Sequence, residues 1–217
     1  MIAGIDEFLA AQPRMGIVCS KSSGLLLNGK FKFCAVSNGF PEIIDTYELQ
    51  ISVPPDYPNS LPKVVETGKR IPRDGNHHIN ANDDSLCLGS SIKIHQILSG
   101  NQTLCGFAQG IITPFLYAMS LKLDFGIDFI FGELKHGREG IFQDYMDMFG
   151  LSEKRQVLET LQLLIKRQKD ANEIPCPCGC NKRFGKCPFR RKLKKIRNRI
   201  NTKVVISELK FLKDSRN

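Results

Sequence analysis

Residues 54–89, PPDYPNSLPKVVETGKRIPRDGNHHINANDDSLCLG, combine a proline-punctuated strand with a long polar loop. The short apolar run at 63–67 predicts a strand. The prolines before it would not be tolerated in the ladder of a central strand. Residues 74–91 are rich in Asn, Asp, Gly, His and Ser and predict a loop. Such a long loop in a compact domain is often functional, and Cys87 is its single cysteine.

Two longer strands are expected upstream of this stretch. Residues 30–36 and 42–53 have strand character, and Ser37-Asn38-Gly39 between them tolerates positive φ, which indicates a hairpin. Together with residues 63–67 they predict an antiparallel meander of three strands.

Helices are expected on both sides of the meander. A short helix is predicted at residues 6–11, and a longer apolar one at 103–121 with a kink at Pro114. Another is expected at 137–148, and Ser152 is predicted to cap a further one. The apolar stripe of that last helix is Val157, Leu158, Leu161, Leu164 and Ile165. The fold class predicted is therefore α+β.

Charge is distributed unevenly along the 217 residues. Residues 166–217 hold 17 Lys/Arg against 4 Asp/Glu, whereas residues 1–165 hold 14 against 18. This pattern predicts a mildly acidic body with a basic tail, whose expected role is solubility or contact with nucleic acid or an acidic partner. In particular, residues 189–200, FRRKLKKIRNRI, predict a basic helix without the aromatic interleaving of a base-stacking surface.

Composition places the chain among soluble globular proteins, with 41% hydrophobic and 24% charged residues. No apolar run is expected to reach the ~18 residues that span a membrane. Asp6 and Glu7 stand where a signal peptide would carry lysines, so a cytoplasmic location is expected.

Half of the eight cysteines crowd into one short segment, PCPCGCNKRFGKCP. Four thiolates around a glycine turn, flanked by cations, suit a tetrahedral zinc ion, and so short a segment needs the metal to fold. The segment resembles the SEC-C motif, CPCGSGKKFKKCC/H, with Cys176, Cys178 and Cys187 as direct matches. The motif has serine at the position of Cys180 and a ligand at that of Pro188, so Cys180 is inferred as the fourth ligand.

The stretch around Cys87 resembles the active-site segment of ubiquitin-conjugating enzymes (the UBC fold). PPDYPNSLPKV is similar to PxDYPxxxPxV, and HHINANDDSLCLG is similar to HPNINxxGxICL. The resemblance implies a UBC-like meander flanked by helices over residues 30–150. It places His77 at the family's histidine and Cys87 at its catalytic cysteine. The family's Asn position holds Ile79, and Asn80 is the nearest substitute.

The short first helix and the lack of tryptophan resemble divergent bacterial members of that family, several of which belong to anti-phage systems of the CBASS kind. The resemblance implies carriage of an acyl group as a thioester. The expected acyl donor is the C-terminal glycine of a ubiquitin-like protein or of a cGAS-like nucleotidyltransferase. An activating enzyme is a further expected partner.

The chemistry of aminolysis suggests roles for the residues near Cys87. A thiol near its ordinary pKa is sufficiently ionised if the acyl group arrives activated. The oxyanion formed on attack needs a donor, for which Asn80, Asn82, His77 and His78 are open alternatives. Acidic residues just before the cysteine, Asp83 and Asp84, are expected to orient or deprotonate the incoming lysine.

Four alternatives stay open, two for Cys87 and two for the whole chain. Cys87 is a packed loop cysteine in one of them, and a zinc ligand with His77, His78 and His95 in another. The chain as a whole is otherwise a non-catalytic scaffold, or a zinc-dependent nucleic-acid or partner-binding protein. Cys105, at the start of the long helix, is expected to pack.

The predicted domain organisation has three parts. Residues 1–150 form the UBC-like domain and residues 151–172 a connecting helix. Residues 173–217 form the zinc motif with its basic tail.

Overall fold

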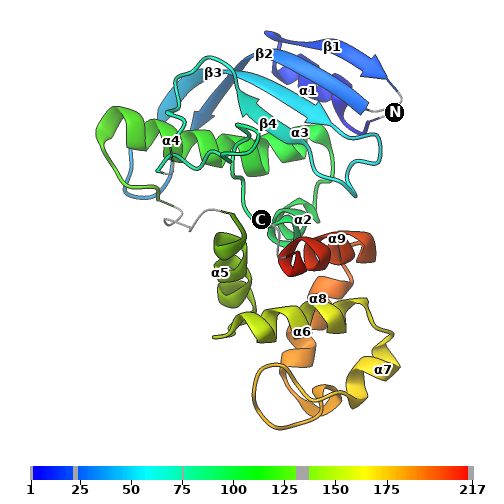
Figure 1. Ribbon diagram of the computed structural model, residues 1–217. Coiled ribbons are helices and arrows are strands. Elements are labelled where there is room, and N and C mark those ends of the chain that lie inside the picture. Colours follow the sequence, from blue (N-terminus) through cyan, green and yellow to red (C-terminus); the bar gives the residue numbers. More distant parts are fainter. Residues whose placement is uncertain (1, 22–23, 75, 131–136, 215–217) are drawn as a thin grey trace. The chain divides into compact units, whose positions relative to one another are not determined.

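The computed structural model describes residues 2–21, 24–74, 76–130 and 137–214 (Figure 1). They form two compact units. Unit 1 comprises Met1–Leu88 and Gly100–Glu133, and unit 2 comprises Gly89–Ser99 and Leu134–Asn217. The predicted α+β class is confirmed, because a four-stranded antiparallel sheet is flanked by helices.

The sheet is a meander in the order β1-β2-β3-β4. Its strands are β1 (Met15–Lys21), β2 (Gly24–Ala35), β3 (Ile43–Val53) and β4 (Lys63–Glu66). The three predicted strands are present, and β1 is an additional edge strand that the sequence analysis did not predict. β2 starts earlier than expected because Gly29 continues the strand at φ 146. A Cβ there would lie 2.1 Å from the carbonyl oxygen of Arg14, so the close approach of β1 requires glycine.

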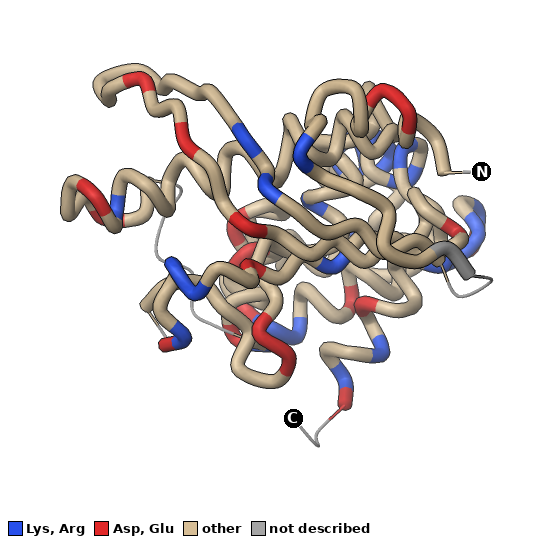
Figure 2. The backbone as a smooth tube through the Cα atoms, turned by 90° about the horizontal axis from the view of Figure 1, so that it is seen from above, with Lys and Arg blue, Asp and Glu red and all other residues tan. Residues whose placement is uncertain are grey.

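Helices cover one face of this sheet (Figure 1). They are α1 (Ile5–Ala11), α3 (Leu104–Phe107), the π-helical turn η1 (Ala108–Ile112) and α4 (Thr113–Phe125). Alternate residues of β2 and β3, among them Leu27, Phe31 and Ile51, are almost fully buried and form the apolar face of the sheet. Charged residues of both signs are interspersed over the strands (Figure 2).

A π-helical turn, η1, directly precedes Pro114, the residue at which a kink was predicted. The N–H of Thr113 donates to the carbonyl of Ala108, five residues earlier, and Pro114 then lies in the first turn of α4. Proline cannot donate an i→i−4 hydrogen bond, and the π-helical turn shifts that hydrogen-bond pattern just before it.

The continuous helix Leu104–Phe125 is long and apolar enough to cross a membrane by length and composition, with a mean hydropathy of 1.4 in its best window. An apolar helix was predicted here at 103–121, but no apolar run long enough to span a membrane was expected. Within the described residues 72% of that window is buried, which is the behaviour of a core helix in a soluble protein.

Unit 2 is helical. Its elements are α2 (Ser91–Leu98), α5 (Gly137–Phe149), α6 (Lys154–Ile165), α7 (Gln168–Glu173), the 3-10 turn η2 (Phe184–Lys186), α8 (Phe189–Arg197) and α9 (Thr202–Lys213). The predicted helix at 137–148 and the basic helix are present. The cap predicted at Ser152 is wrong, because Glu153 is the N-cap and forms a reciprocal capping box with Gln156.

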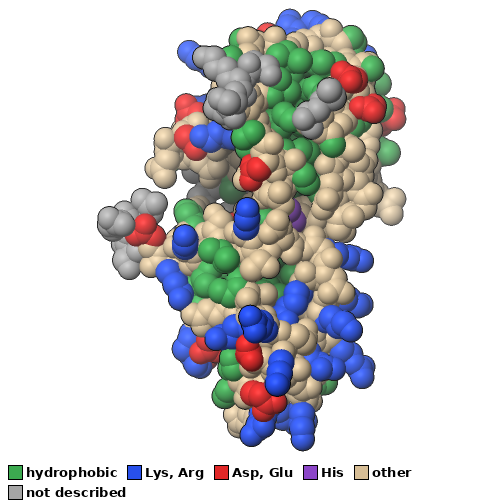
Figure 3. All heavy atoms as spheres, turned by 90° about the vertical axis from the view of Figure 1, so that its right-hand side faces the viewer, with side chains coloured by type: hydrophobic (Ala, Val, Ile, Leu, Met, Phe, Trp, Pro, Cys, Tyr) green, Lys and Arg blue, Asp and Glu red, His purple; other side chains and the backbone are tan. Residues whose placement is uncertain are grey.

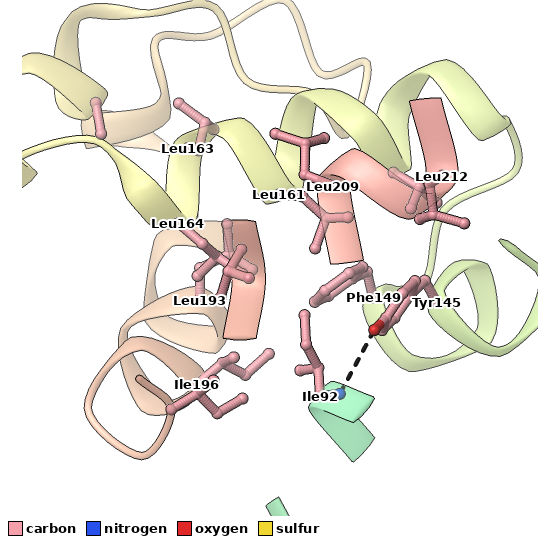
Figure 4. Packing of buried hydrophobic residues seen from close by; sticks show 14 of the residues in the cluster. Ile92, Tyr145, Phe149, Leu161, Leu163, Leu164, Leu193, Ile196, Leu209 and Leu212 are labelled. Atoms are coloured by element: carbon pink, nitrogen blue, oxygen red, sulfur yellow. Dashed lines mark hydrogen bonds between the residues drawn. The ribbon is translucent and has the colours of Figure 1, made fainter. Parts of the chain in front are cut away.

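One hydrophobic core joins these helices (Figure 4). Ile92 of α2 lies beside Tyr145 and Phe149 of α5, and its N–H is 3.5 Å from the Tyr145 hydroxyl oxygen. Leu161 of α6 and Leu209 of α9 belong to the same core. Helices α5, α6 and α7 therefore share a core with the cysteine segment and with the region expected to be a basic tail. The predicted boundary at residue 150 falls inside unit 2.

Candidate thiol site and metal centre

Cys87 lies at the end of a small hairpin, residues 78–87, which we call the thiol hairpin. The N–H of Cys87 donates to the carbonyl of His78 at 2.7 Å, and the N–H of Asn80 donates to the carbonyl of Ser85 at 2.8 Å. Ile79 and Leu86 form a bridge between these bonds. The predicted loop thus contains a hydrogen-bonded ladder that fixes the backbone of Cys87.

The thiol hairpin is anchored to the edge of the sheet. The N–H of Leu86 donates to the carbonyl of Val64 in β4 at 2.8 Å, and Ser85 forms a bridge with Val65. Ile79 and Leu86 are 6% and 4% exposed, so the hairpin also contributes to the core of unit 1. Burial explains why this position is Ile79: an apolar side chain suits it, and the adjacent Asn80 is only half-buried.

The two histidines occupy different environments. His78 is 2% exposed, adopts a positive φ of 51, and packs on Phe129 with ring centroids 4.3 Å apart. His77 is half-buried, and its Nδ1 lies 2.6 Å from Oδ1 of Asp74. Through its backbone, His78 is therefore the histidine directly opposite Cys87, whereas His77 is oriented by a carboxylate.

Asn80 takes part in a chain of polar contacts along the thiol hairpin. Its amide donates to the Ser85 hydroxyl at 2.9 Å, and that hydroxyl donates to Asp83 at 2.5 Å. Asp83 in turn pairs with Lys63 at 2.7 Å. Burial alone would raise the pKa of Asp83, but the hydrogen bonds from Lys63 and Ser85 outweigh it and lower the pKa.

Asp84 is exposed and has a φ of 55 at the tip of the hairpin, where its N–H donates to the carbonyl of Asn80. Cys87 itself is half-buried. The structure thus places Cys87, His78, Asn80 and Asp84 on one short hairpin.

Several neighbours of this site were not singled out from the sequence. Ser85, Lys63 and Phe129 contact predicted site residues. The turn-forming residues between Asn80 and Ser85 could have indicated a hairpin inside the loop. Phe129 lies too far along the chain for a local sequence pattern to reveal its contact with His78.

The four C-terminal cysteines converge. The Sγ atoms of Cys176, Cys178, Cys180 and Cys187, the cysteine cluster, all lie within 4.8 Å of one another. The separation is 3.2 Å from Cys176 to Cys178, 3.6 Å from Cys178 to Cys187 and 3.5 Å from Cys180 to Cys187. A zinc ion with four sulfurs at about 2.3 Å requires sulfur separations of roughly 3.8 Å. The cluster therefore has the size of a tetrahedral zinc site.

Local backbone geometry builds this cluster. Gly179 and Asn181 have positive φ of 79 and 55, which turns the chain sharply on both sides of Cys180. The N–H of Cys176 donates to the carbonyl of Lys182 at 2.9 Å, which closes the turn. The N–H of Phe189 points at Sγ of Cys187 at 3.4 Å, so the start of α8 is tied to a ligand sulfur.

The electrostatic surroundings of the four thiols differ. Burial raises the pKa of Cys176 and of Cys178. The backbone N–H of Lys182 is the main cause that lowers the pKa of Cys180 to about 7. A divalent cation would offset the repulsion among four thiolates and would hold them all deprotonated. The donor set, four thiolates at tetrahedral spacing, fits zinc better than an oxygen-preferring cation.

In the described part of the chain, the cysteine cluster is the one group of three or more His, Cys, Asp or Glu side chains close enough to hold an ion. The alternative zinc site of Cys87 with His77, His78 and His95 takes three residues from unit 1 and one from unit 2. His95 lies in α2 of unit 2, with its Nδ1 2.7 Å from the carbonyl oxygen of Ser91.

Comparison with known proteins identifies no relative. No protein-family model, no curated protein and no solved structure matches this chain.

Proposed function

We propose that the chain is a ubiquitin-conjugating-like transferase that carries an acyl group as a thioester on Cys87. The observation that carries this proposal is the half-buried Cys87 on a hydrogen-bonded hairpin at the edge of a helix-flanked meander. An acyl carrier needs a thiol in a fixed position that stays reachable from solvent. A cysteine on a flexible tail would not have a fixed position, and a cysteine in the core would not be reachable from solvent.

In the first step the Cys87 thiolate attacks the carbonyl carbon of an activated acyl donor. The thiol proton has passed to solvent or to a nearby base when the thiolate formed; a carbon–sulfur bond then forms and the donor's leaving group departs. In the second step a lysine amine attacks the thioester, the carbon–sulfur bond breaks, and the amine loses a proton. An amide and the free Cys87 thiol result.

The polar side chains of the hairpin suit the second step. Asp84 is exposed and close in sequence to Cys87, so it would orient and deprotonate the amine. Asn80 would supply the oxyanion donor after exchanging its bond to Ser85 for one to the developing charge. Removal of such a donor typically lowers the rate by ~100-fold or more.

The partners that follow from this proposal are a ubiquitin-like protein or a cGAS-like nucleotidyltransferase ending in glycine, with an activating enzyme to supply the acyl group. Bacterial anti-phage defence, inside the cytoplasm, is the setting proposed. The cysteine cluster would hold a structural zinc ion far in sequence from the reacting thiol.

The test is adduct formation with such a donor and activating enzyme, followed on non-reducing gels. The wild-type chain should give an adduct that thiols cleave, and Cys87→Ser should give a thiol-stable oxyester or none. Cys105→Ser, another half-buried cysteine of unit 1, is the matched control and should behave as wild type. An adduct that persists in Cys87→Ala would exclude the proposal.

A second candidate is a non-catalytic scaffold with the same architecture. It is favoured by the engagement of the Asn80 amide with Ser85, which leaves that amide directed along the hairpin. Thiol labelling separates the two: a Cys87 that stays unreactive towards iodoacetamide in the folded protein, while exposed Cys34 reacts, would favour the scaffold.

A further inference from the structure

The cysteine cluster is followed by the most one-sided charge distribution in the chain. Residues 174–207 contain eleven Lys/Arg and no Asp or Glu. The basic residues are Lys182, Arg183, Lys186, Arg190, Arg191, Lys192, Lys194, Lys195, Arg197, Arg199 and Lys203. Figure 3 shows Lys and Arg side chains gathered over the surface of unit 2.

Two of these cations have structural partners. Arg183 pairs with Glu173 at 2.6 Å. Arg197 is half-buried and donates to Gln168 at 3.1 Å and to the carbonyl of Leu163. Within the described ranges of the chain, none of the other nine lies within ion-pair distance of a carboxylate. Their charges are thus available to a ligand.

Helix α8 arranges five of the available cations around its solvent face. Leu193 and Ile196 are buried, which turns the rest of the helix outward. The exposed positions are Arg190, Arg191, Lys192, Lys194 and Lys195, and every one is charged. Arg190 with Lys194, and Arg191 with Lys195, form two rows whose members are about 6 Å apart along the helix axis.

This face fits a polyanion better than a protein partner. Protein interfaces have an apolar or aromatic centre inside a polar rim, whereas the outer face of α8 has no exposed apolar residue. Phe189, the one aromatic residue of α8, packs on the core and meets Phe184 edge-on. Without an exposed aromatic ring the helix lacks a platform for stacking unpaired bases.

We propose that the outer face of α8 binds the phosphate backbone of duplex nucleic acid without reading its sequence. The rows of cations would contact successive phosphates, and release of counterions would drive binding. The tie between the Phe189 N–H and Sγ of Cys187 fixes the orientation in which α8 presents these cations. DNA and RNA duplexes both present a phosphate backbone, so binding to each is measured separately.

The experiment measures binding of the full zinc-loaded chain to fluorescent duplex DNA and duplex RNA of scrambled sequence over roughly 50 to 200 mM salt. Wild type should bind at least one duplex with affinity that falls steeply with salt. The variant with Arg190→Gln, Arg191→Gln, Lys194→Gln and Lys195→Gln should bind about tenfold more weakly or worse. Its salt slope should fall by about 3.6, because each phosphate contact contributes about 0.9.

The matched control removes four exposed cations from unit 1 and so has the same net charge: Arg14→Gln, Lys30→Gln, Lys32→Gln and Lys69→Gln. It should bind as wild type does. Conservative Arg190→Lys with Arg191→Lys should also preserve binding, because a point charge suffices. Equal losses in both quadruple variants, or binding to anionic vesicles or polyglutamate but to neither duplex, would overturn the proposal.

Discussion

The thiol hairpin and the cysteine cluster both place sulfur atoms on short, turn-rich segments, but different forces hold them. The thiol hairpin is held by backbone hydrogen bonds to the edge of the sheet and by the burial of two of its apolar side chains, Ile79 and Leu86. In the cluster, four sulfurs approach within 4.8 Å of one another, which without a cation brings repulsion and desolvation. Backbone hydrogen bonds fix one thiol by itself, whereas four thiols this close together suit a shared metal ion.

The largest predicted difference between the two regions is their response to metal removal. Zinc supplies an apparent ~10–16 kcal/mol to small structural sites, so chelation, or Cys187→Ser, should expose the core around α8 and η2. Hydrogen exchange measured by mass spectrometry should show lost protection in residues 174–197, with the sheet of unit 1 as internal reference. The metal released should equal one zinc ion per chain.

Exposed Cys34→Ser is the control for that experiment and should keep both zinc and protection. Retention of full protection in residues 174–197 by the metal-free chain would show that the cluster does not depend on an ion.

A smaller effect is expected from Ser85→Ala in the thiol hairpin. The substitution removes the acceptor of the Asn80 amide and the donor to Asp83, at a cost of about 1 kcal/mol for each net hydrogen bond lost. Chemical denaturation should show this shift, and zinc content should stay unchanged. If transfer from Cys87 is measured as well, a freed Asn80 should not slow it; a ~100-fold loss would mean that Ser85 itself acts in the reaction.

The smallest effect is a pH dependence confined to the thiol hairpin. The folded pKa of Asp83 lies below its unfolded value, so its contribution to stability is present above the unfolded pKa. As pH falls through the folded pKa, in the acid range below about pH 4, that contribution is lost. Because the Lys63–Asp83 pair is partly exposed, the change should be about 0.2–1 kcal/mol.

Amide exchange of Ser85, whose N–H donates to Asp83, should report this loss, and Asp83→Asn should abolish the pH dependence. A hairpin whose exchange is equally pH-sensitive in Asp83→Asn would assign the effect to another group.

Local patterns predicted much of the sheet and missed its first strand. Strands β3 and β4 lie where apolar alternation and turn residues place them. β1 was missed because it is an edge strand with Ile17 and Val18 exposed, so it shows no clear alternation of buried and exposed positions. The predicted start at residue 30 was too late because Gly29 lies inside β2, where it admits the neighbouring backbone.

The cysteine cluster was predicted in full because its ligands lie within one short segment, so spacing alone carries the information. The description of residues 173–217 as a zinc motif with a basic tail was incomplete, because the burial of α9 does not depend on local spacing. The interpretation of this region from its net charge overlooked the apolar stripe of α9. That stripe is buried against helices distant in sequence and consists of Val204, Val205, Leu209 and Leu212. At the thiol hairpin the side-chain partners of Asn80 and His78 depend on tertiary packing and had no local signal.

The chain leaves unit 1 at Leu88, contributes α2 to unit 2, and returns at Gly100. Unit 2 is therefore discontinuous, and the apolar side of α2 is synthesised well before the helices that cover Ile92. During synthesis on the ribosome, all four strands of the meander are complete before α5, α6 and α9, which cover α2, have been made. A fragment cut after residue 133 would contain α2 without the helices that cover its apolar side. Expression of the two units as separate pieces would thus require moving α2, by circular permutation, to join its own core.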